Sequence, residues 1–238
     1  MKHGEARFLS CMYVLSLLLL AGFAANGLRS AAAVSAETAV PVVIVLDPGH
    51  GGMDGGAAGA DGTLESSLNL SIALKTDAVL GLLGEQTLLT RSTDADLSGP
   101  EAKTISQKKV SDIRRRVEIV NSQAGALLLS IHCNTYSEEK YHGAQVFYTG
   151  TASKALAEVL QEALQAHVDP GNTRKAKTIS PDVYLMKHIT APGVLLECGF
   201  LSNLAELRNL KDPGYQNRLA VTIAVTAAGY RPENFSGV

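Results

Sequence analysis

The sequence predicts a single α/β domain in which helices flank a largely parallel central sheet. Apolar runs of strand length alternate with segments of helical periodicity along the chain. The first of these runs, over residues 42–46, is apolar throughout, as in a strand that is buried on both faces of a parallel sheet. The 238 residues suffice for one domain of about 200 residues with an N-terminal extension, but not for two well-built cores.

The expected strands and helices alternate, beginning with two β-α-β units. The first strand covers residues 42–46 and stops at Asp47-Pro48-Gly49. The later elements, in chain order, are a helix over 68–83, a strand over 86–90, a helix over 112–123, a strand over 126–131, a strand over 143–148, a helix over 153–167, a strand over 194–196 and a helix over 215–230.

Two polar segments, residues 92–109 and 169–181, fit neither period and are punctuated by glycine or proline. We expect both to be surface loops. Long loops in a compact domain are often binding loops or lids, so both segments are candidates for shaping access to a substrate.

Residues 1–36 have the pattern of a targeting segment. Lys2 and Arg7 precede a mostly apolar run over residues 8–25, and small residues follow it. Val34-Ser35-Ala36 fits a cleavage site, while a run of about 18 residues also approaches the length that spans a bilayer. We therefore expect an exported chain with either a signal peptide or an N-terminal membrane anchor. The catalytic domain is expected over residues 37–238, with its core at about 42–230.

Charge and cysteine content exclude two classes of protein. A net charge of -2 offers no broad basic surface for phosphates, so we expect no binding to nucleic acid. Beyond the targeting segment only Cys133 and Cys198 remain, too few for a disulfide framework. Side chains alternate along a strand, so both cysteines should point away from the neighbouring His132 and Glu197. Whether the two cysteines pair with each other stays open.

Three potential zinc ligands, His50, Glu65 and His132, lie where α/β proteins usually place their chemistry, at or just beyond strand ends. Two histidines and a glutamate form a ligand set of catalytic zinc and leave one coordination position for water. Glu197 follows another apolar run, and we expect it to act as general base and general acid in hydrolysis of an amide.

Each ligand also has a plainer interpretation. Alone, His50 would more often be a structural loop residue, Glu65 would favour a helix N-terminus, and His132 would be a satisfied core histidine. The glycine-rich stretch over residues 49–62 lacks the motifs of phosphate-binding loops. The occurrence of His50, Glu65 and His132 together favours the metal site over these plainer interpretations.

The motifs around these residues resemble those of the zinc-dependent N-acetylmuramoyl-L-alanine amidases over about residues 42–230. The matching motifs are Asp47-Pro48-Gly49-His50-Gly51-Gly52-Met53-Asp54-Gly55-Gly56, Glu65 with Asn69, Thr90-Arg91, Arg116 with Asn121, Ser130-Ile131-His132-Cys133-Asn134 and Glu197-Cys198-Gly199-Phe200-Leu201-Ser202-Asn203. The resemblance implies one zinc ion per chain on His50, Glu65 and His132, with Glu197 as the catalytic residue. Arg116 is expected to brace the loops of the site through Asn121 or a carboxylate.

A narrower resemblance, to the spore-cortex germination-specific amidases, is carried by shorter motifs. These are Lys109-Val110-Ser111-Asp112, Asn172-Thr173-Arg174-Lys175-Ala176-Lys177 and Tyr184-Leu185-Met186. It implies that the enzyme removes stem peptides from muramic acid in spore cortex, before a deacetylase forms muramic lactam. Vegetative cell-wall remodelling is the main alternative. A zinc endopeptidase, a sugar deacetylase and an inactive wall-binding scaffold are weaker ones.

The resemblance also implies partners and a location. Peptidoglycan is the expected substrate, and some relatives are regulated by an accessory protein. The N-terminal segment provides an expected contact with the membrane. The expected location is extracytoplasmic, at the cell wall or the membrane, including the forespore intermembrane space.

Overall fold

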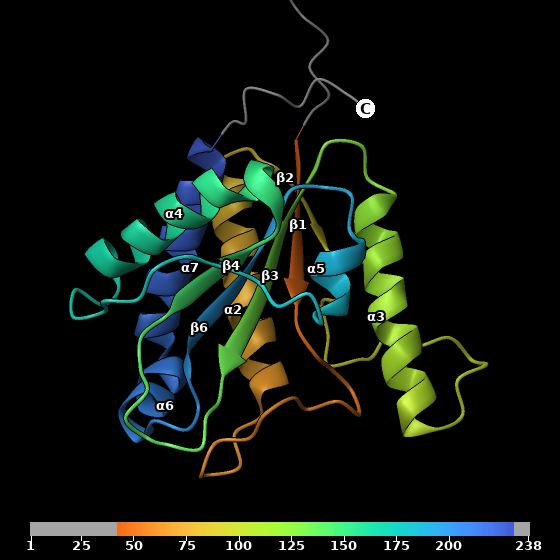
Figure 1. The fold of residues 1–238 in the computed structure, drawn as a ribbon, viewed down its shortest axis with the longest axis horizontal. Coiled ribbons are helices and arrows are strands. Elements are labelled where there is room, and N and C mark those ends of the chain that lie inside the picture. Colours follow the sequence, from red (N-terminus) through yellow and green to blue (C-terminus); the bar gives the residue numbers. More distant parts are fainter. Residues whose placement is uncertain (1–41, 231–238) are drawn as a thin grey trace, which may run out of the picture. The chain divides into compact units, whose positions relative to one another are not determined.

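A six-stranded sheet runs through residues 42–230, the part of the chain that the computed structural model describes (Figure 1). Its strand order is β2-β1-β3-β6-β4-β5. In chain order the strands are β1 (Val43–Pro48), β2 (Gln86–Leu89), β3 (Ala126–Asn134), β4 (Gln145–Tyr148), β5 (Lys177–Thr178) and β6 (Gly193–Phe200). The pairs among β2, β1, β3 and β6 are parallel, and only β4 pairs with β6 in the antiparallel sense. The predicted α/β class with a largely parallel sheet is confirmed.

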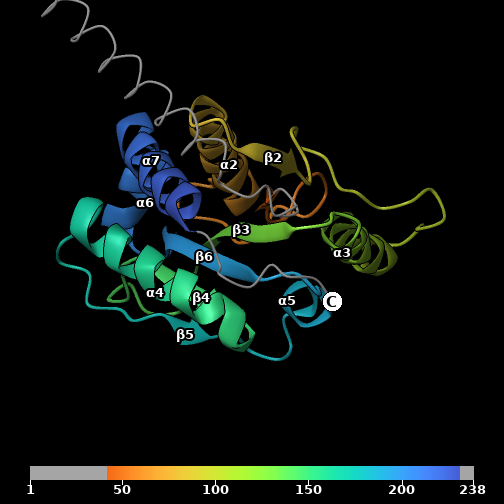
Figure 2. The same cartoon turned by 90° about the horizontal axis from the view of Figure 1, so that it is seen from above.

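Six helices of the described residues flank this sheet. They are α2 (Glu65–Leu82), α3 (Ile105–Asn121), α4 (Gly150–His167), α5 (Tyr184–His188), α6 (Leu204–Lys211) and α7 (Pro213–Gly229). Figures 1 and 2 show α3 and α5 together on the opposite side of the sheet from α2 and α7. The sheet is therefore covered on both faces, as its apolar strands predict.

Alternation along the strands divides the core into two clusters. Leu127, Leu129 and Ile131 of β3 point into a larger cluster with α2, α4, α6 and α7. Leu128 points the other way, into a smaller cluster with α3 and α5. Both clusters are fully buried at the middle of β3, so this strand anchors the sheet from both sides.

The N-terminus of α3 corrects one expectation. Residues 92–109 were expected to form a loop, but the helix begins at Ile105. Thr104 accepts a hydrogen bond from the backbone of Gln107, and the Gln107 side chain accepts one from the backbone of Thr104. This capping box satisfies two amides at the helix start, which lies about two turns before the predicted one.

Three short elements, β5, α5 and α6, were not predicted from the sequence. The expectation for the N-terminal segment cannot be compared with the structure. The signal peptide or anchor expected over residues 1–36 lies outside the described residues. Within residues 42–230, no helix combines the length and the apolar character that crossing a membrane requires.

Candidate metal centre

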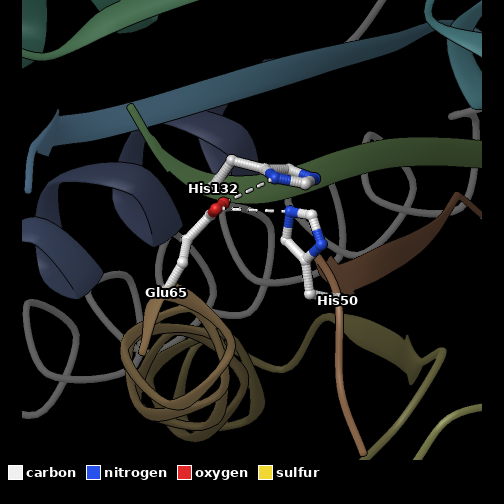
Figure 3. A group of neighbouring side chains, drawn as sticks. All are labelled: His50, Glu65 and His132. Atoms are coloured by element: carbon white, nitrogen blue, oxygen red, sulfur yellow. Dashed lines mark hydrogen bonds and ion pairs between the residues drawn. The ribbon is translucent and has the colours of Figure 1, made fainter. Parts of the chain in front are cut away.

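Three donor side chains converge beyond the carboxyl ends of β1 and β3. His50 follows β1, His132 lies near the end of β3, and Glu65 is the first residue of α2. Figure 3 shows the Glu65 carboxylate reaching toward both imidazole rings. Its Oε1 lies 2.9 Å from His132 Nδ1, and its Oε2 lies 3.3 Å from His50 Nε2. One donor atom from each residue lies within 4.8 Å of the other two, so the predicted residues form one cluster.

The turn after β1 holds His50 in an unusual backbone conformation. His50 has φ 61°, and no other non-glycine residue among 42–230 has a positive φ. Such a conformation is strained and needs contacts that maintain it. Arg116 Nη2 donates to the His50 carbonyl at 2.7 Å, and Arg91 Nη2 donates to the Gly49 carbonyl at 2.9 Å. Two arginines from other segments thus fix the path of the turn.

Arg116 itself is buried and paired with acidic side chains. Its Nη1 lies 2.6 Å from Asp47 Oδ1 and its Nε 2.7 Å from Asp112 Oδ2. Asp47 also accepts from Thr90 at 2.7 Å and from Ser130 at 2.8 Å. The expectation that Arg116 braces the loops through a carboxylate is confirmed.

Asn121, the other expected partner of Arg116, lies elsewhere. Its amide contacts the backbone of His188 and Thr190 at 3.0 and 2.9 Å. It therefore holds the segment after α5, and the expected contact with Arg116 is absent.

A second set of contacts orients the donors. His50 Nδ1 lies 2.9 Å from Asp54 Oδ2, which leaves Nε2 for the cluster. Lys109 of α3 lies 2.9 Å from the other Asp54 oxygen. Carboxylates in this position fix the tautomer and the ring orientation of a ligating histidine. Glu65 is held by the backbone amide of Ala57 at 2.9 Å and by Asn69 at 3.2 Å.

The electrostatics of the cluster are those of a site that favours a cation. Burial alone would raise the pKa of Glu65, but hydrogen bonds and positive charge from His132 and His50 hold it well below its ordinary value. Burial lowers the pKa of His50, and Glu65 and Asp54 outweigh this effect and raise it to about 9. An ionised carboxylate and two convergent imidazoles fit a zinc ion by donor type.

Glu197 lies beside this cluster with one unpaired oxygen. Its Cα is the register partner of His132 in the parallel pair β3 and β6. Its Oε2 is buried and has no hydrogen-bond partner within residues 42–230. Burial and the negative charge of Glu65 raise the pKa of Glu197 to about 7, against the opposing effect of His132 and His50. A carboxyl group with this pKa can accept or donate a proton near neutral pH.

Two glycines, which have no side chain, make room for the donor side chains. A Cβ at Gly49 would lie 2.1 Å from Cε1 of His132. A Cβ at Gly56 would lie 2.6 Å from Glu65 Oε2, and Gly56 has φ +69°. The rings and the carboxylate therefore pack directly against backbone, which limits how far the donors can move.

The two cysteines lie behind the site. Cys133 and Cys198 are buried in the larger core cluster, on the face opposite to His132 and Glu197, as predicted. Both are free thiols, so the pairing left open by the sequence is not formed. Burial raises the pKa of both thiols, which keeps them protonated and unreactive.

Comparisons with known proteins agree with these motifs. The family model for "N-acetylmuramoyl-L-alanine amidase" matches residues 44–227. The germination-specific N-acetylmuramoyl-L-alanine amidase of Bacillus subtilis is 40% identical over 183 residues, which cover 76% of this chain and 76% of the relative.

Solved structures of amidases are also similar to this chain. The CwlD amidase of Clostridioides difficile, determined in complex with the GerS lipoprotein, matches with a TM-score of 0.75 and 39% identity over 78% of this chain and 96% of that one. The catalytic domain of CwlV, an amidase from Bacillus (Paenibacillus) polymyxa, matches with a TM-score of 0.65 and 30% identity over 78% and 97%.

Replacing Gly49 by alanine should weaken zinc binding by about tenfold or more, because the new methyl group would displace the His132 ring. Titration with zinc against a chromogenic chelator measures this change. Gly81→Ala is the matched control, since a Cβ at this helical position meets nothing within 4 Å. Wild-type zinc affinity in Gly49→Ala would contradict the geometry.

Metal-free protein should lose stability as pH rises through about 7. Between the ordinary pKa of a glutamate, about 4.3, and the pKa of about 7 at Glu197, the folded chain holds a proton that the unfolded chain has released. This contribution is present at lower pH and is lost as pH rises through the folded value. In Glu197→Gln the loss should be smaller, while the raised pKa of His50 should affect both proteins.

Thermal unfolding midpoints of chelator-treated proteins between about pH 5 and 8 test this linkage. Glu158→Gln, at an exposed position of α4, should keep the wild-type pH dependence. An unchanged slope in Glu197→Gln would count against a raised pKa at Glu197.

Proposed function

This chain belongs to the N-acetylmuramoyl-L-alanine amidase family, and we propose that it works with a zinc ion on His50, Glu65 and His132 and with Glu197 as its proton-transfer residue. The activity itself follows from the match: the protein is an enzyme that hydrolyses the amide between N-acetylmuramic acid and L-alanine in peptidoglycan. The observation that carries the proposal is the unpaired, buried Glu197 oxygen beside three convergent donors.

His50 Nε2, His132 Nδ1 and a Glu65 oxygen would hold the metal. A bound zinc ion supplies a Lewis acid, which polarises an amide carbonyl and lowers the pKa of a bound water to about 7. Asp54 keeps the His50 ring in the tautomer that presents Nε2. Because the backbone of Gly49 and Gly56 packs against the donors, the ligand geometry exists before metal or substrate arrives.

Glu197 performs the proton transfers of the reaction. Its carboxylate takes a proton from the attacking water and then gives it to the departing nitrogen of L-alanine. The pKa of about 7 in the metal-free chain suits a group that must do both, and a nearby cation would lower it. Oε2 makes no hydrogen bond with any residue that the structure describes, which leaves that oxygen available for the transferred proton.

The proposed setting is spore cortex. The germination-specific amidase of Bacillus subtilis, at 40% identity, supports this setting over vegetative remodelling. The enzyme is extracytoplasmic, as its peptidoglycan substrate requires, and we place it in the forespore intermembrane space. The CwlD structure in complex with the GerS lipoprotein supports an accessory protein as a further partner.

Zinc-loaded wild-type chain should release peptides that begin with L-alanine from purified peptidoglycan. Glu197→Gln should reduce this release by about 100-fold or more, since general acid-base catalysis contributes at least this much, and should keep its zinc. Mass spectrometry of the products and metal analysis of the protein measure both effects. Glu158→Gln, the same change at an exposed glutamate, should be fully active.

Other products would identify other reactions. Cuts inside the stem peptide would indicate an endopeptidase, and released acetate would indicate a deacetylase. Full activity of zinc-loaded Glu197→Gln would show that another group transfers the proton.

Spores whose chain carries Glu197→Gln should contain cortex without muramic lactam, because lactam formation requires prior removal of the stem peptide. Muropeptide analysis of spore peptidoglycan measures the lactam content. Normal lactam content in these spores, with altered vegetative wall, would favour the vegetative alternative.

A further inference from the structure

One arginine near Glu197 has no role in the chemistry described above. Arg174 lies in the segment between α4 and β5, one of the two segments that the sequence marked as candidates for substrate access. Its side chain is half-buried, and no carboxylate among residues 42–230 lies within ion-pair distance of it. This differs from the buried Arg116, which pairs with Asp47 and Asp112.

The Arg174 guanidinium is held on three sides. Nε donates to the His142 carbonyl at 2.7 Å, and Nη1 donates to Gln145 Oε1 at 2.7 Å. The Phe200 ring lies below it, with its centroid 4.5 Å from the guanidinium carbon. Nη2 has no hydrogen-bond partner in the part of the chain that the structure describes. The group is thus oriented, with N–H donors to spare.

Polar side chains hold the backbone of this segment as well. Asn172 is buried and accepts from the Arg174 amide at 2.9 Å, while Gln165 of α4 donates to the Arg174 carbonyl at 2.8 Å. Gln145 Nε2 donates to the Lys175 carbonyl at 2.8 Å. Binding a ligand here would require little further ordering of the arginine, which favours affinity.

The sheet register puts Arg174 on the side of the metal centre. Gln145 and Glu197 are Cα partners in the antiparallel pair β4 and β6. Directly opposite residues point to the same face of a sheet, so Gln145 and Glu197 share a face. Their neighbours Val146 and Leu196 point to the other face, into the larger core cluster. Arg174 is therefore bound to the side chain of Gln145, the residue directly opposite the proposed base.

We propose that Arg174 binds a free carboxylate of the stem peptide and so selects the substrate. This inference rests on the proposed function, in which Glu197 protonates the nitrogen of the departing stem peptide. In peptidoglycan the residue after L-alanine is a glutamate joined through its side chain, which leaves an α-carboxylate one residue beyond the cleaved amide. A planar guanidinium with spare N–H groups matches a carboxylate, whereas a carboxamide in its place would present N–H groups to a cation.

Two synthetic muramoyl peptides that differ only in this group, carboxylate or carboxamide, test the proposal on the zinc-loaded full chain. Wild type should prefer the carboxylate by about tenfold or more in kcat/KM, the size expected of a charged hydrogen bond. Arg174→Gln should lose this preference, mainly through a higher KM for the carboxylate substrate. Arg174→Lys keeps the positive charge but lacks the planar pair of N–H donors, so it should retain part of the preference for the carboxylate.

Lys175→Gln is the matched control, because it removes the same charge from an exposed neighbour and should keep the wild-type preference. Equal use of the two substrates by wild type would overturn the proposal, as would an unchanged preference in Arg174→Gln. Should Arg174→Gln not fold, an undiminished preference in Arg174→Lys would overturn it.

Binding separates this inference from the proposed function. The zinc-loaded Glu197→Gln chain should bind the carboxylate peptide about tenfold more tightly than the carboxamide, and adding Arg174→Gln should abolish the difference. If wild type cleaved neither substrate, the proposed function would fail, and these binding constants would still decide the role of Arg174. Equal binding of both peptides by the Glu197→Gln chain would contradict the proposed role of Arg174.

Discussion

The site depends on the buried ion pair between Arg116 and Asp47. Removing Arg116 would leave the buried charge of Asp47 without an ion-pair partner, at a cost of several kcal/mol. The same guanidinium holds the carbonyl of His50, whose backbone is in the left-handed region. The packing of α3 on the sheet therefore also positions His50, one of the proposed metal ligands. A substitution on the far side of α3 that shifts Arg116 would be felt at His50, although it touches no donor.

Much of the fold could be predicted because its strands are continuous apolar runs bounded by glycine, proline or a polar residue. The run before Asp47 and the run before His132 both became central parallel strands. The start of α3 was missed because Thr104 and Gln107, which form its capping box, lie in a polar stretch that looks like a loop. The elements β5, α5 and α6 are too short for their periodicity to be recognised.

The donor side chains of the site could be predicted from the sequence, but most contacts that hold these side chains in place could not. His50, Glu65 and His132 carry ligand chemistry in their side chains, and the strand ends bring two of them together. Asp54 and Arg91 stood inside recognised motifs, yet their partners depend on how a glycine-rich turn folds back. The contact between Arg174 and Gln145 depends on the pairing of β4 with β5, and the position of Gln145 opposite Glu197 depends on the register of β4 against β6. The hydrophobic pattern does not encode either at single-residue precision.

The donors also come from three separate parts of the fold, a turn, a helix start and a strand. Glu65 and His132 are 67 residues apart along the chain, and α2, β2 and α3 all lie between them. Because these donors come together only when the chain folds, the proposed metal ion would bind the folded chain and stabilise it by an amount that grows with the logarithm of the free metal concentration. With zinc bound as proposed, scarcity of the ion would lower the amount of folded enzyme as well as the fraction that is active, so zinc supply would also control how much of the protein survives.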